Sequence, residues 1–399
     1  MTQQQLAAER YTKAYVSALE NGLVRPSMAA LTFFAERLRM PASRLIGDEA
    51  PTWNRLEADL QLAAGKYTDA IDGYTSLLES ATEPAQRAEL LVGRAEAEAR
   101  MNQGPEASAD AAEAARLFAA AGRGTDEALA TYWLANGQYE QDNLSEARGL
   151  LRGLIDKVRT GLRVAPDFEF RVLMALSTVE SKEGEHARAL AYLQEVQSVL
   201  GDLDDRRRAT YLLDLAYSYR ETGDMEAAIR SGHESLALFR ASGAESESAI
   251  LENNLALVYL AIGNLARAAE YSVEARRRFE RLNDRRRLAH VEDTAAQIAL
   301  REDRPEAALE IAARAIGHAE ATQNVGALTS AHVTIARAQA AMNDLEAAQV
   351  SYEHAAELVR ESGPRVRLRE VLGEWAELLA RLGQHERAYA LTREALASG

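Results

Sequence analysis

The chain has 399 residues, of which 47% are hydrophobic and 27% are charged, a profile typical of globular proteins. It contains no cysteine, which excludes disulfides, thiolate nucleophiles and cysteine-based zinc sites and fits a reducing compartment. It contains no apolar run of about eighteen residues, and its net charge of −15 argues against non-specific binding of nucleic acid by the whole surface. We therefore expect a cytoplasmic protein that does not span a membrane.

The first 49 residues form a separate unit in the predicted organisation. Six basic and five acidic residues give them a net charge of +1, whereas the rest of the chain carries −16. Their apolar pattern is out of register with that of the later residues, and they end at the linker Gly47-Asp48-Glu49-Ala50-Pro51. We predict one domain over 1–49 and a second over 50–399.

Within the first domain, Thr12 can cap a short helix that runs to Asn21. Gly22 can end that helix. At helical spacing, Lys13 and Ser17 lie near its exposed face, while Val16 turns inward. This geometry would present a short helix to the major groove of DNA.

This segment resembles the lambda-repressor-like helix-turn-helix family, also called xenobiotic-response-element-type regulators. The matching residues are Gln3, Leu6 and Ala7, the run Val16 to Gly22, the triplet Arg25-Pro26-Ser27, and Leu31, Ala35, Leu38 and Pro41. The resemblance implies that Gln3 and Arg25 contact backbone phosphates and that Lys13, Ser17 and Asn21 read base edges. Asn21 as a plain helix cap and Lys13 as a solvated charge are the alternatives.

Two features of this segment depart from the family pattern. The turn Arg10-Tyr11-Thr12 is one residue short, and the family's first helix, which should precede Thr2, is absent. Either the chain begins at a downstream start, or the domain has lost a helix. The second case predicts a helix-turn-helix remnant that no longer binds DNA.

From about Trp53 onward, nine short turns recur between apolar-periodic stretches. Each turn opens on Gly, Asn or Asp, and the last five steps between these marker residues are 39, 40, 40, 40 and 40. The markers are Gly65, Asn102, Asp142, Gly184, Gly223, Gly263, Asp303, Asn343 and Gly383. These residue types tolerate the left-handed backbone found at helix ends, so each repeat is predicted to be helix, turn, helix.

Small residues recur at two fixed positions around every marker. An alanine stands five residues after each marker, as at Ala268, and alanine or serine stands seven residues before it, as at Ala256. Two helices joined by a tight turn approach closely only where both side chains are small. The pattern therefore predicts about eighteen repeat helices between Trp53 and Ala397, with Ala256 and Ala268 meeting at one crossing.

These residues resemble the tetratricopeptide motif over roughly seven eighths of the chain, with a period of about 40 residues where about 34 is usual. The resemblance implies an all-α fold, a right-handed solenoid of about nine helix pairs. In this family the first helix of each pair lines a concave wall on which partners dock. An inert spacer is the alternative.

The tetratricopeptide resemblance places inward positions of the first helices at ten, six and three residues before each marker. In the middle and later repeats, the polar or aromatic residues at these positions include Asn136, Tyr217, Arg220, Asn253, Asp293, Gln297 and Arg337. Asparagine and arginine hold a peptide backbone or a carboxylate through paired hydrogen bonds. We predict that these residues bind an effector, with an ordinary wet groove as the alternative. We expect Asn253 and Arg337 to face solvent when the groove is empty.

Motifs of catalysis and cofactor binding are not found. The sequence has no Gly-rich phosphate loop, no His-Glu-x-x-His pair, no nucleophile elbow and no Asp-rich calcium loop. We expect no enzyme activity, no metal and no cofactor. Three arginine triplets, at 206–208, 276–278 and 285–287, lie near predicted helix ends, where cations complement neighbouring acids.

The combined pattern resembles bacterial transcription regulators that carry a tetratricopeptide body. It implies a homodimer whose heads bind operator DNA and whose solenoid binds a peptide or protein effector. The alternative is an interaction scaffold with a degenerate head.

Overall fold

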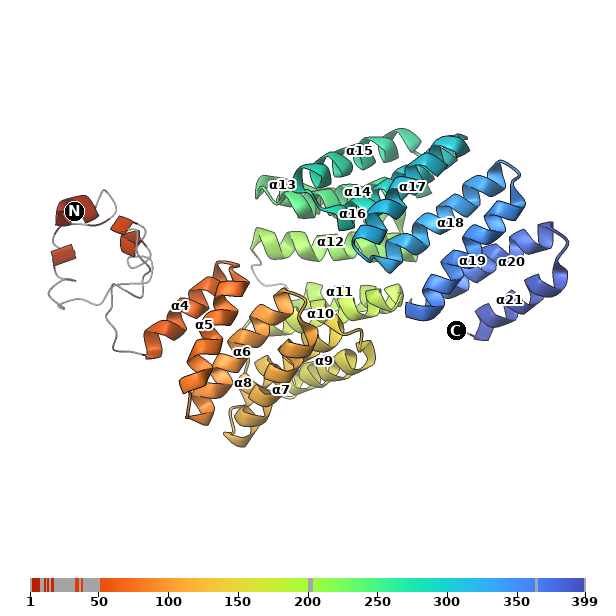
Figure 1. The fold of residues 1–399 in the computed structure, drawn as a ribbon. Coiled ribbons are helices and arrows are strands. Elements are labelled where there is room, and N and C mark those ends of the chain that lie inside the picture. Colours follow the sequence, from red (N-terminus) through yellow and green to blue (C-terminus); the bar gives the residue numbers. More distant parts are fainter. Residues whose placement is uncertain are drawn as a thin grey trace. The chain divides into compact units, whose positions relative to one another are not determined.

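A computed structural model describes residues 2–7, 11, 13, 16–17, 33–35, 37–38, 51–199, 204–362 and 365–397 (Figure 1). After the short helix α1 (Gln3–Ala7), eighteen helices follow one another in the described part of the chain, as predicted. They are α4 (Pro51–Ala63), α5 (Tyr67–Ser80), α6 (Pro84–Arg100), α7 (Gly104–Ala120), α8 (Gly124–Glu140), α9 (Leu144–Arg159), α10 (Phe168–Lys182), α11 (His186–Val199), α12 (Asp205–Thr222), α13 (Met225–Ala241), α14 (Glu245–Ala261), α15 (Leu265–Leu282), α16 (Arg285–Arg301), α17 (Pro305–Ala321), α18 (Val325–Ala341), α19 (Leu345–Ser362), α20 (Arg365–Arg381) and α21 (His385–Ala397).

The helices pack as consecutive pairs, α4 with α5 through α20 with α21. The chain divides into two compact units, which we call unit 1 (Met1–Ala165) and unit 2 (Pro166–Gly399). Helices α4–α9 belong to unit 1, and α10–α21 belong to unit 2. No helix in the described ranges combines the length and the apolar character that a membrane span needs.

The turn inside each pair has the predicted left-handed residue. All nine markers have a positive φ, from 59° at Asn102 to 89° at Gly223. Only glycine adopts this conformation without strain, and asparagine and aspartate tolerate it better than other residues. The composition of the markers therefore follows from the backbone of the turn.

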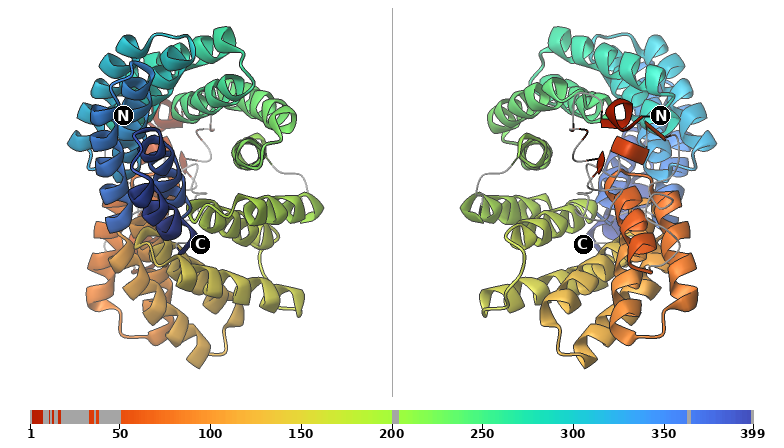
Figure 2. Two further views of the ribbon diagram at one scale, coloured as in Figure 1. Left: turned by 90° about the vertical axis from the view of Figure 1, so that its right-hand side faces the viewer. Right: turned by 90° about the vertical axis from the view of Figure 1, so that its left-hand side faces the viewer.

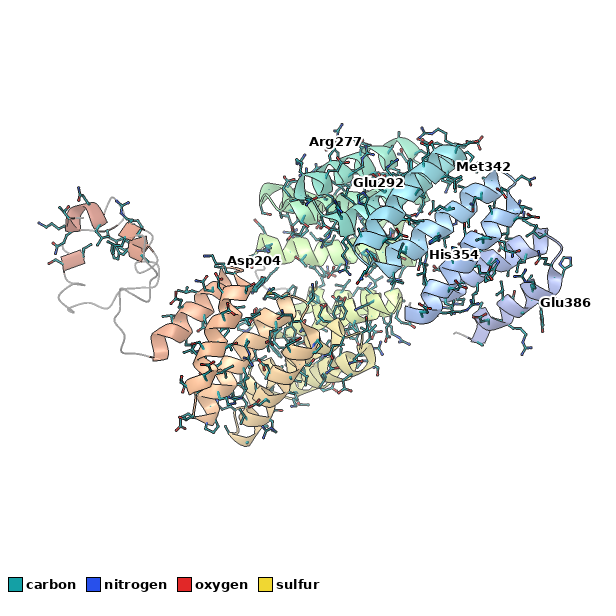
Figure 3. All side chains as sticks on the ribbon, in the orientation of Figure 1. Asp204, Arg277, Glu292, Met342, His354 and Glu386 are labelled. Atoms are coloured by element: carbon teal, nitrogen blue, oxygen red, sulfur yellow. The ribbon has the colours of Figure 1, made fainter. Side chains whose placement is uncertain are left out.

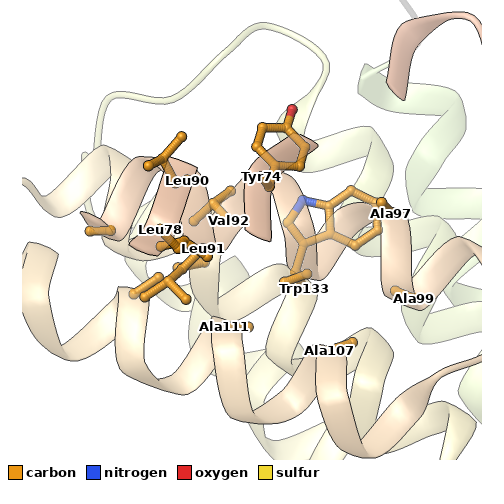
Figure 4. Packing of buried hydrophobic residues seen from close by; sticks show 14 of the residues in the cluster. Tyr74, Leu78, Leu90, Leu91, Val92, Ala97, Ala99, Ala107, Ala111 and Trp133 are labelled. Atoms are coloured by element: carbon orange, nitrogen blue, oxygen red, sulfur yellow. The ribbon is translucent and has the colours of Figure 1, made fainter. Parts of the chain in front are cut away.

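The small residues around the markers are buried throughout the solenoid. Ala256 and Ala268 are both completely buried, in the adjacent helices α14 and α15. Larger side chains fill the remaining space between pairs. In unit 1, the rings of Tyr74 and Trp133 pack among aliphatic residues of α5, α6 and α7 (Figure 4). Burial of these residues agrees with the steric interpretation of the alanine pattern.

The first helices of the pairs form one layer within each unit. In unit 2, α10 contacts α12, α12 contacts α14, α14 contacts α16 and α16 contacts α18, in addition to the contacts within each pair. In the described ranges, successive second helices do not pack against one another to this extent. A row of pairs with this asymmetry bends toward its first helices. We call the exposed side of the first-helix layer of unit 2 its inner face.

Candidate functional site

Polar side chains bridge successive first helices along the inner face of unit 2. Arg220 on α12 donates to Asn254 on α14, Thr334 on α18 donates to Asp293 on α16, and Arg337 on α18 donates to Glu374 on α20. Each bond joins residues 34 to 41 positions apart in the chain. These bonds therefore depend on how the pairs stack and not on any single helix.

Arg220 is held by three groups at the junction of α12 and α14. Its guanidinium lies 4.8 Å from the centre of the Tyr217 ring, forms an ion pair with Glu221 and donates to Oδ1 of Asn254. Tyr217 itself is 37% exposed. Because a guanidinium only donates hydrogen bonds, Arg220 fixes the oxygen of the Asn254 amide on its own side.

The orientation of Asn254 leaves its amide nitrogen without a partner. Asn254 is only 5% exposed, and its Nδ2 is buried with no acceptor among the described residues. The preceding residue, Asn253, is partly exposed, and its Oδ1 is buried with no donor in the same part of the chain. These neighbouring residues of α14 thus have one unsatisfied donor and one unsatisfied acceptor. Leaving both without a partner costs free energy, which a hydrogen bond to a ligand or to water would recover.

Asp214 adds an isolated acid to the inner face. It lies on α12, two turns before Arg220, and is partly buried. No described residue forms a hydrogen bond or ion pair with its carboxylate. Burial alone raises the pKa of Asp214 to about 7. A cationic ligand group would restore the charged form of Asp214 and gain a charge-assisted hydrogen bond.

Two of the predicted residues serve the helix packing. Asp293 is 5% exposed, and its two oxygens accept from Thr334 Oγ1 at 2.7 Å and from Gln297 Nε2 at 2.8 Å. Burial raises the pKa of Asp293, and these two bonds offset part of the rise. Asp293 was predicted to bind the effector, and in the structure its side chain lies between α16 and α18 with both oxygens engaged. Gln297 is partly buried and supports it.

Arg337 is partly exposed, with 39% of its side chain accessible, but it is not free for a ligand. It binds Glu374 with two hydrogen bonds, of 2.8 and 2.6 Å, and Tyr352 donates to the same carboxylate at 3.0 Å. Burial opposes ionisation of Glu374, but the bonds and charge of Arg337 outweigh it and lower the pKa. Removing Arg337 would therefore leave Glu374 without its cation and would cost stability.

The remaining predicted positions lie in unit 1. Asn136 on α8 donates from Nδ2 to the backbone oxygen of Tyr132 in its own helix. In the first 49 residues, Lys13 is exposed, Gln3 and Ser17 are partly buried, and Val16 is buried as predicted. Asn21 and Arg25 lie outside the described residues.

Two residues of the inner face were missed by counting only positions ten, six and three before each marker. Asp214 and Asn254 lie nine residues before their markers, as Glu374 also does. Positions nine, six and thirteen before a marker share one helical stripe, because they are three or four residues apart. The signal in the sequence is that the residue nine before the marker is polar in the five later repeats, from Asp214 to Glu374, and not in the four earlier ones.

The arginine triplets are largely tied to acids. Arg277 binds Glu274 at 2.9 Å, and Arg276 and Arg314 both approach Glu292, which lies among α15, α16 and α17 (Figure 3). Arg207 binds Asp167 at 2.9 Å. These contacts agree with the interpretation of the triplets as charges that complement neighbouring acids. No group of three or more histidine and acidic side chains in the described ranges has the geometry to hold a metal ion.

Comparison with known proteins assigns the fold. No protein-family model matches the sequence, and no curated protein matches it either. The structure is similar to a Rap protein complexed with competence and sporulation factor, with a TM-score of 0.67, 15% identity and coverage of 87% of this chain and 97% of the Rap chain. A second similar structure is the Rap conjugation gene regulator of the plasmid pLS20 in complex with the Phr peptide, with a TM-score of 0.56, 12% identity and coverage of 87% and 95%.

A third similar structure is a STAND signal-transduction ATPase with a tetratricopeptide repeat sensor from Pyrococcus horikoshii. Its TM-score is 0.59, its identity is 16%, and the match covers 91% of this chain and 62% of that one. At such identities the likeness shows the fold alone. The fold is that of a tetratricopeptide-like helical solenoid.

Proposed function

We propose that this protein is a regulator whose solenoid binds a short peptide effector on the inner face of unit 2. The observation that carries the proposal is the unsatisfied acceptor of Asn253 beside the unsatisfied donor of Asn254. An extended residue of a peptide offers its own N–H and C=O on the same side, complementary to this acceptor and donor. Two solved structures with this fold contain a bound competence and sporulation factor and a bound Phr peptide, respectively, which supports a peptide as the ligand.

The neighbouring groups suggest how a peptide would be oriented. Arg220 holds the Asn254 amide so that Nδ2 remains a donor. The partly exposed ring of Tyr217 offers an apolar surface near Asn254. Asp214, three residues before Tyr217 on α12, offers a carboxylate without a partner among the described residues. A peptide with a free amino terminus or a basic side chain matches this arrangement.

Loss of the two amides is expected to weaken peptide binding. A library of short synthetic peptides is first screened for those that raise the unfolding temperature of the parent, since a ligand at 100 times its Kd adds about 2.7 kcal/mol of stability. For the best peptide, Asn253→Ala and Asn254→Ala should each reduce the affinity about tenfold, because a hydrogen bond contributes roughly 1 kcal/mol and the group left behind is unpaired. Isothermal titration calorimetry measures the change.

The matched control is Gln194→Ala, which removes an exposed amide from the second helix α11. It should leave the affinity unchanged.

Asp214→Asn tests the charge. A basic peptide should bind the parent less tightly as the pH falls below about 7, because Asp214 then takes up a proton, and the variant should lose this pH dependence of the affinity. Equal affinity in both asparagine variants and the parent, or a library with no binder, rejects the proposal.

We further propose that residues 1–49 bind operator DNA as part of a homodimer. The proposal rests on the helix-turn-helix resemblance and on the exposure of Lys13. Lys13→Ala should weaken binding to an inverted-repeat site from the gene's own promoter and lower the slope of log K against log salt by about one. Gln3→Ala should also weaken it.

Fluorescence anisotropy in a salt titration makes this measurement. Lys66→Ala, at an exposed lysine of the solenoid, is the control and should bind like the parent. If both head variants bind like the parent, or no binding occurs at all, the first domain takes no part in DNA recognition. The scaffold alternative then holds.

A further inference from the structure

The turn between α10 and α11 meets the start of α20 within unit 2. A Cβ atom at Gly184, the marker of that turn, would lie 3.2 Å from both Cβ and Cγ2 of Val366. Gly184 has a φ of 82°, so its backbone also favours glycine. Helix α20 belongs to the ninth repeat and Gly184 to the fourth, so unit 2 bends far enough for its first pair to touch its last (Figures 1 and 2).

His186, the first residue of α11, extends this contact to α12. Its ring packs edge-on against Tyr217, with ring centres 5.5 Å apart, and its Nε2 lies 3.8 Å from a carboxylate oxygen of Glu221. Burial lowers the pKa of His186, while the charges of Glu221 and of Glu370 on α20 act against the change. Burial and the same two acids raise the pKa of Tyr217. Three elements distant in sequence therefore converge around His186.

Tyr217 and Arg220 take part in both the inner face and this junction. One side of the Tyr217 ring faces the His186 ring, and the ring also carries the guanidinium that orients Asn254. A ligand that contacts Tyr217 or Arg220 alters the surroundings of His186 directly. A group shared between two sites couples them, because each then biases the same local arrangement.

We propose that the contact of the α10–α11 turn with α20 is a latch that closes unit 2, and that Tyr217 couples it to the inner face. The closed form has Gly184 against Val366 and His186 against Tyr217. The open form separates the first pair of unit 2 from its last. The coupling part rests on the proposed ligand face, whereas the latch itself does not.

The absence of cysteine in the chain allows a direct test by disulfide trapping. In the Gly184→Cys/Val366→Cys double variant, oxidised glutathione takes two electrons from the two thiols, which join as a disulfide, and is released as two molecules of glutathione. A disulfide requires a distance of about 3.5–4.5 Å between the two Cβ atoms. A Cβ at Gly184 would lie 3.2 Å from Cβ of Val366, slightly below this range. We expect nearly complete cross-linking, measured as loss of free thiol and as a shift on a non-reducing gel.

The matched control is Gly223→Cys/Val366→Cys. Gly223 is also a marker with a positive φ, but a Cβ there would meet nothing within 4 Å. It should retain both thiols. If the test pair cross-links no faster than this control while circular dichroism shows an intact helical fold, the latch does not exist.

Coupling is tested in the same background without any ligand. Adding Tyr217→Ala should slow cross-linking about threefold to tenfold, because an edge-on ring pair is lost from the closed form. Tyr389→Ala, at an exposed tyrosine of α21, should leave the rate unchanged. An unchanged rate with Tyr217→Ala removes the coupling but keeps the latch. Because no peptide is used, neither result depends on whether the peptide proposal holds.

Discussion

Replacing both Ala256 and Ala268 with leucine is expected to lower the free energy of unfolding by about 2–6 kcal/mol, at roughly 1–3 for each overpacked position. Both alanines are completely buried in the packed pair α14 and α15. Their methyl groups occupy places where the helices approach closely, so three more carbon atoms on each side force the helices apart. Urea unfolding followed by circular dichroism measures the loss.

The control for this pair is Ala261→Leu, at an exposed position near the end of the same helix α14. It should change stability by less than about 0.5 kcal/mol. A double variant as stable as the parent would show that these alanines do not limit the approach of the helices. The repeat register would then need revision.

A second large effect is expected at Glu252, which is completely buried on α14. Its carboxylate accepts from Arg240 at 2.8 Å and from Arg278 at 3.0 and 3.1 Å. Glu252→Ala should cost about 3 kcal/mol, near the lower end for breaking a buried ion pair, because Arg278 retains its ion pair with Glu245. Chemical denaturation of the parent and the variant measures the difference.

Single arginine variants separate charge from packing at this site. Arg240→Ala and Arg278→Ala should each cost less than Glu252→Ala, because the remaining arginine still neutralises the carboxylate. Together they should cost more than the sum, since Glu252 is then buried without a cation. Glu226→Ala, at a side chain that is 85% exposed, is the neutral control. Additive costs for the two arginines would contradict the shared-carboxylate interpretation.

The repeat architecture could be predicted from sequence because it depends on local sterics. A left-handed turn requires Gly, Asn or Asp, and a close helix crossing requires a small side chain. Both requirements mark the chain at a fixed spacing, so the position of each pair followed from counting. Ala256 and Ala268 are both buried in the paired helices α14 and α15, as this counting requires.

The inner face was only partly predictable because its contacts join different repeats. Asp293 is buried because Thr334, 41 residues later, reaches its carboxylate across the helix layer. Arg337 is engaged because Glu374 stands 37 residues later in a matching position. Sequence spacing shows on which side of its helix a residue lies. The angle between successive helix pairs then decides which residues of neighbouring repeats contact one another. Asp214 and Asn254 stand nine residues before their markers, one residue after the position at ten that was used for the prediction.

Every repeat has the same types of residue at its turn and at its helix crossing, and this affects how the chain can gain or lose repeats. Because every pair uses the same small residues at its crossing, deletion or duplication of one whole repeat during recombination would preserve the fit between the helices on either side. The bonds between first helices would not be preserved, since Arg220, Asp293 and Arg337 each find a partner in one particular following repeat. Gain or loss of a repeat would therefore keep the fit of the helices at each crossing but change the polar contacts between first helices, so the same event can alter the ligand face.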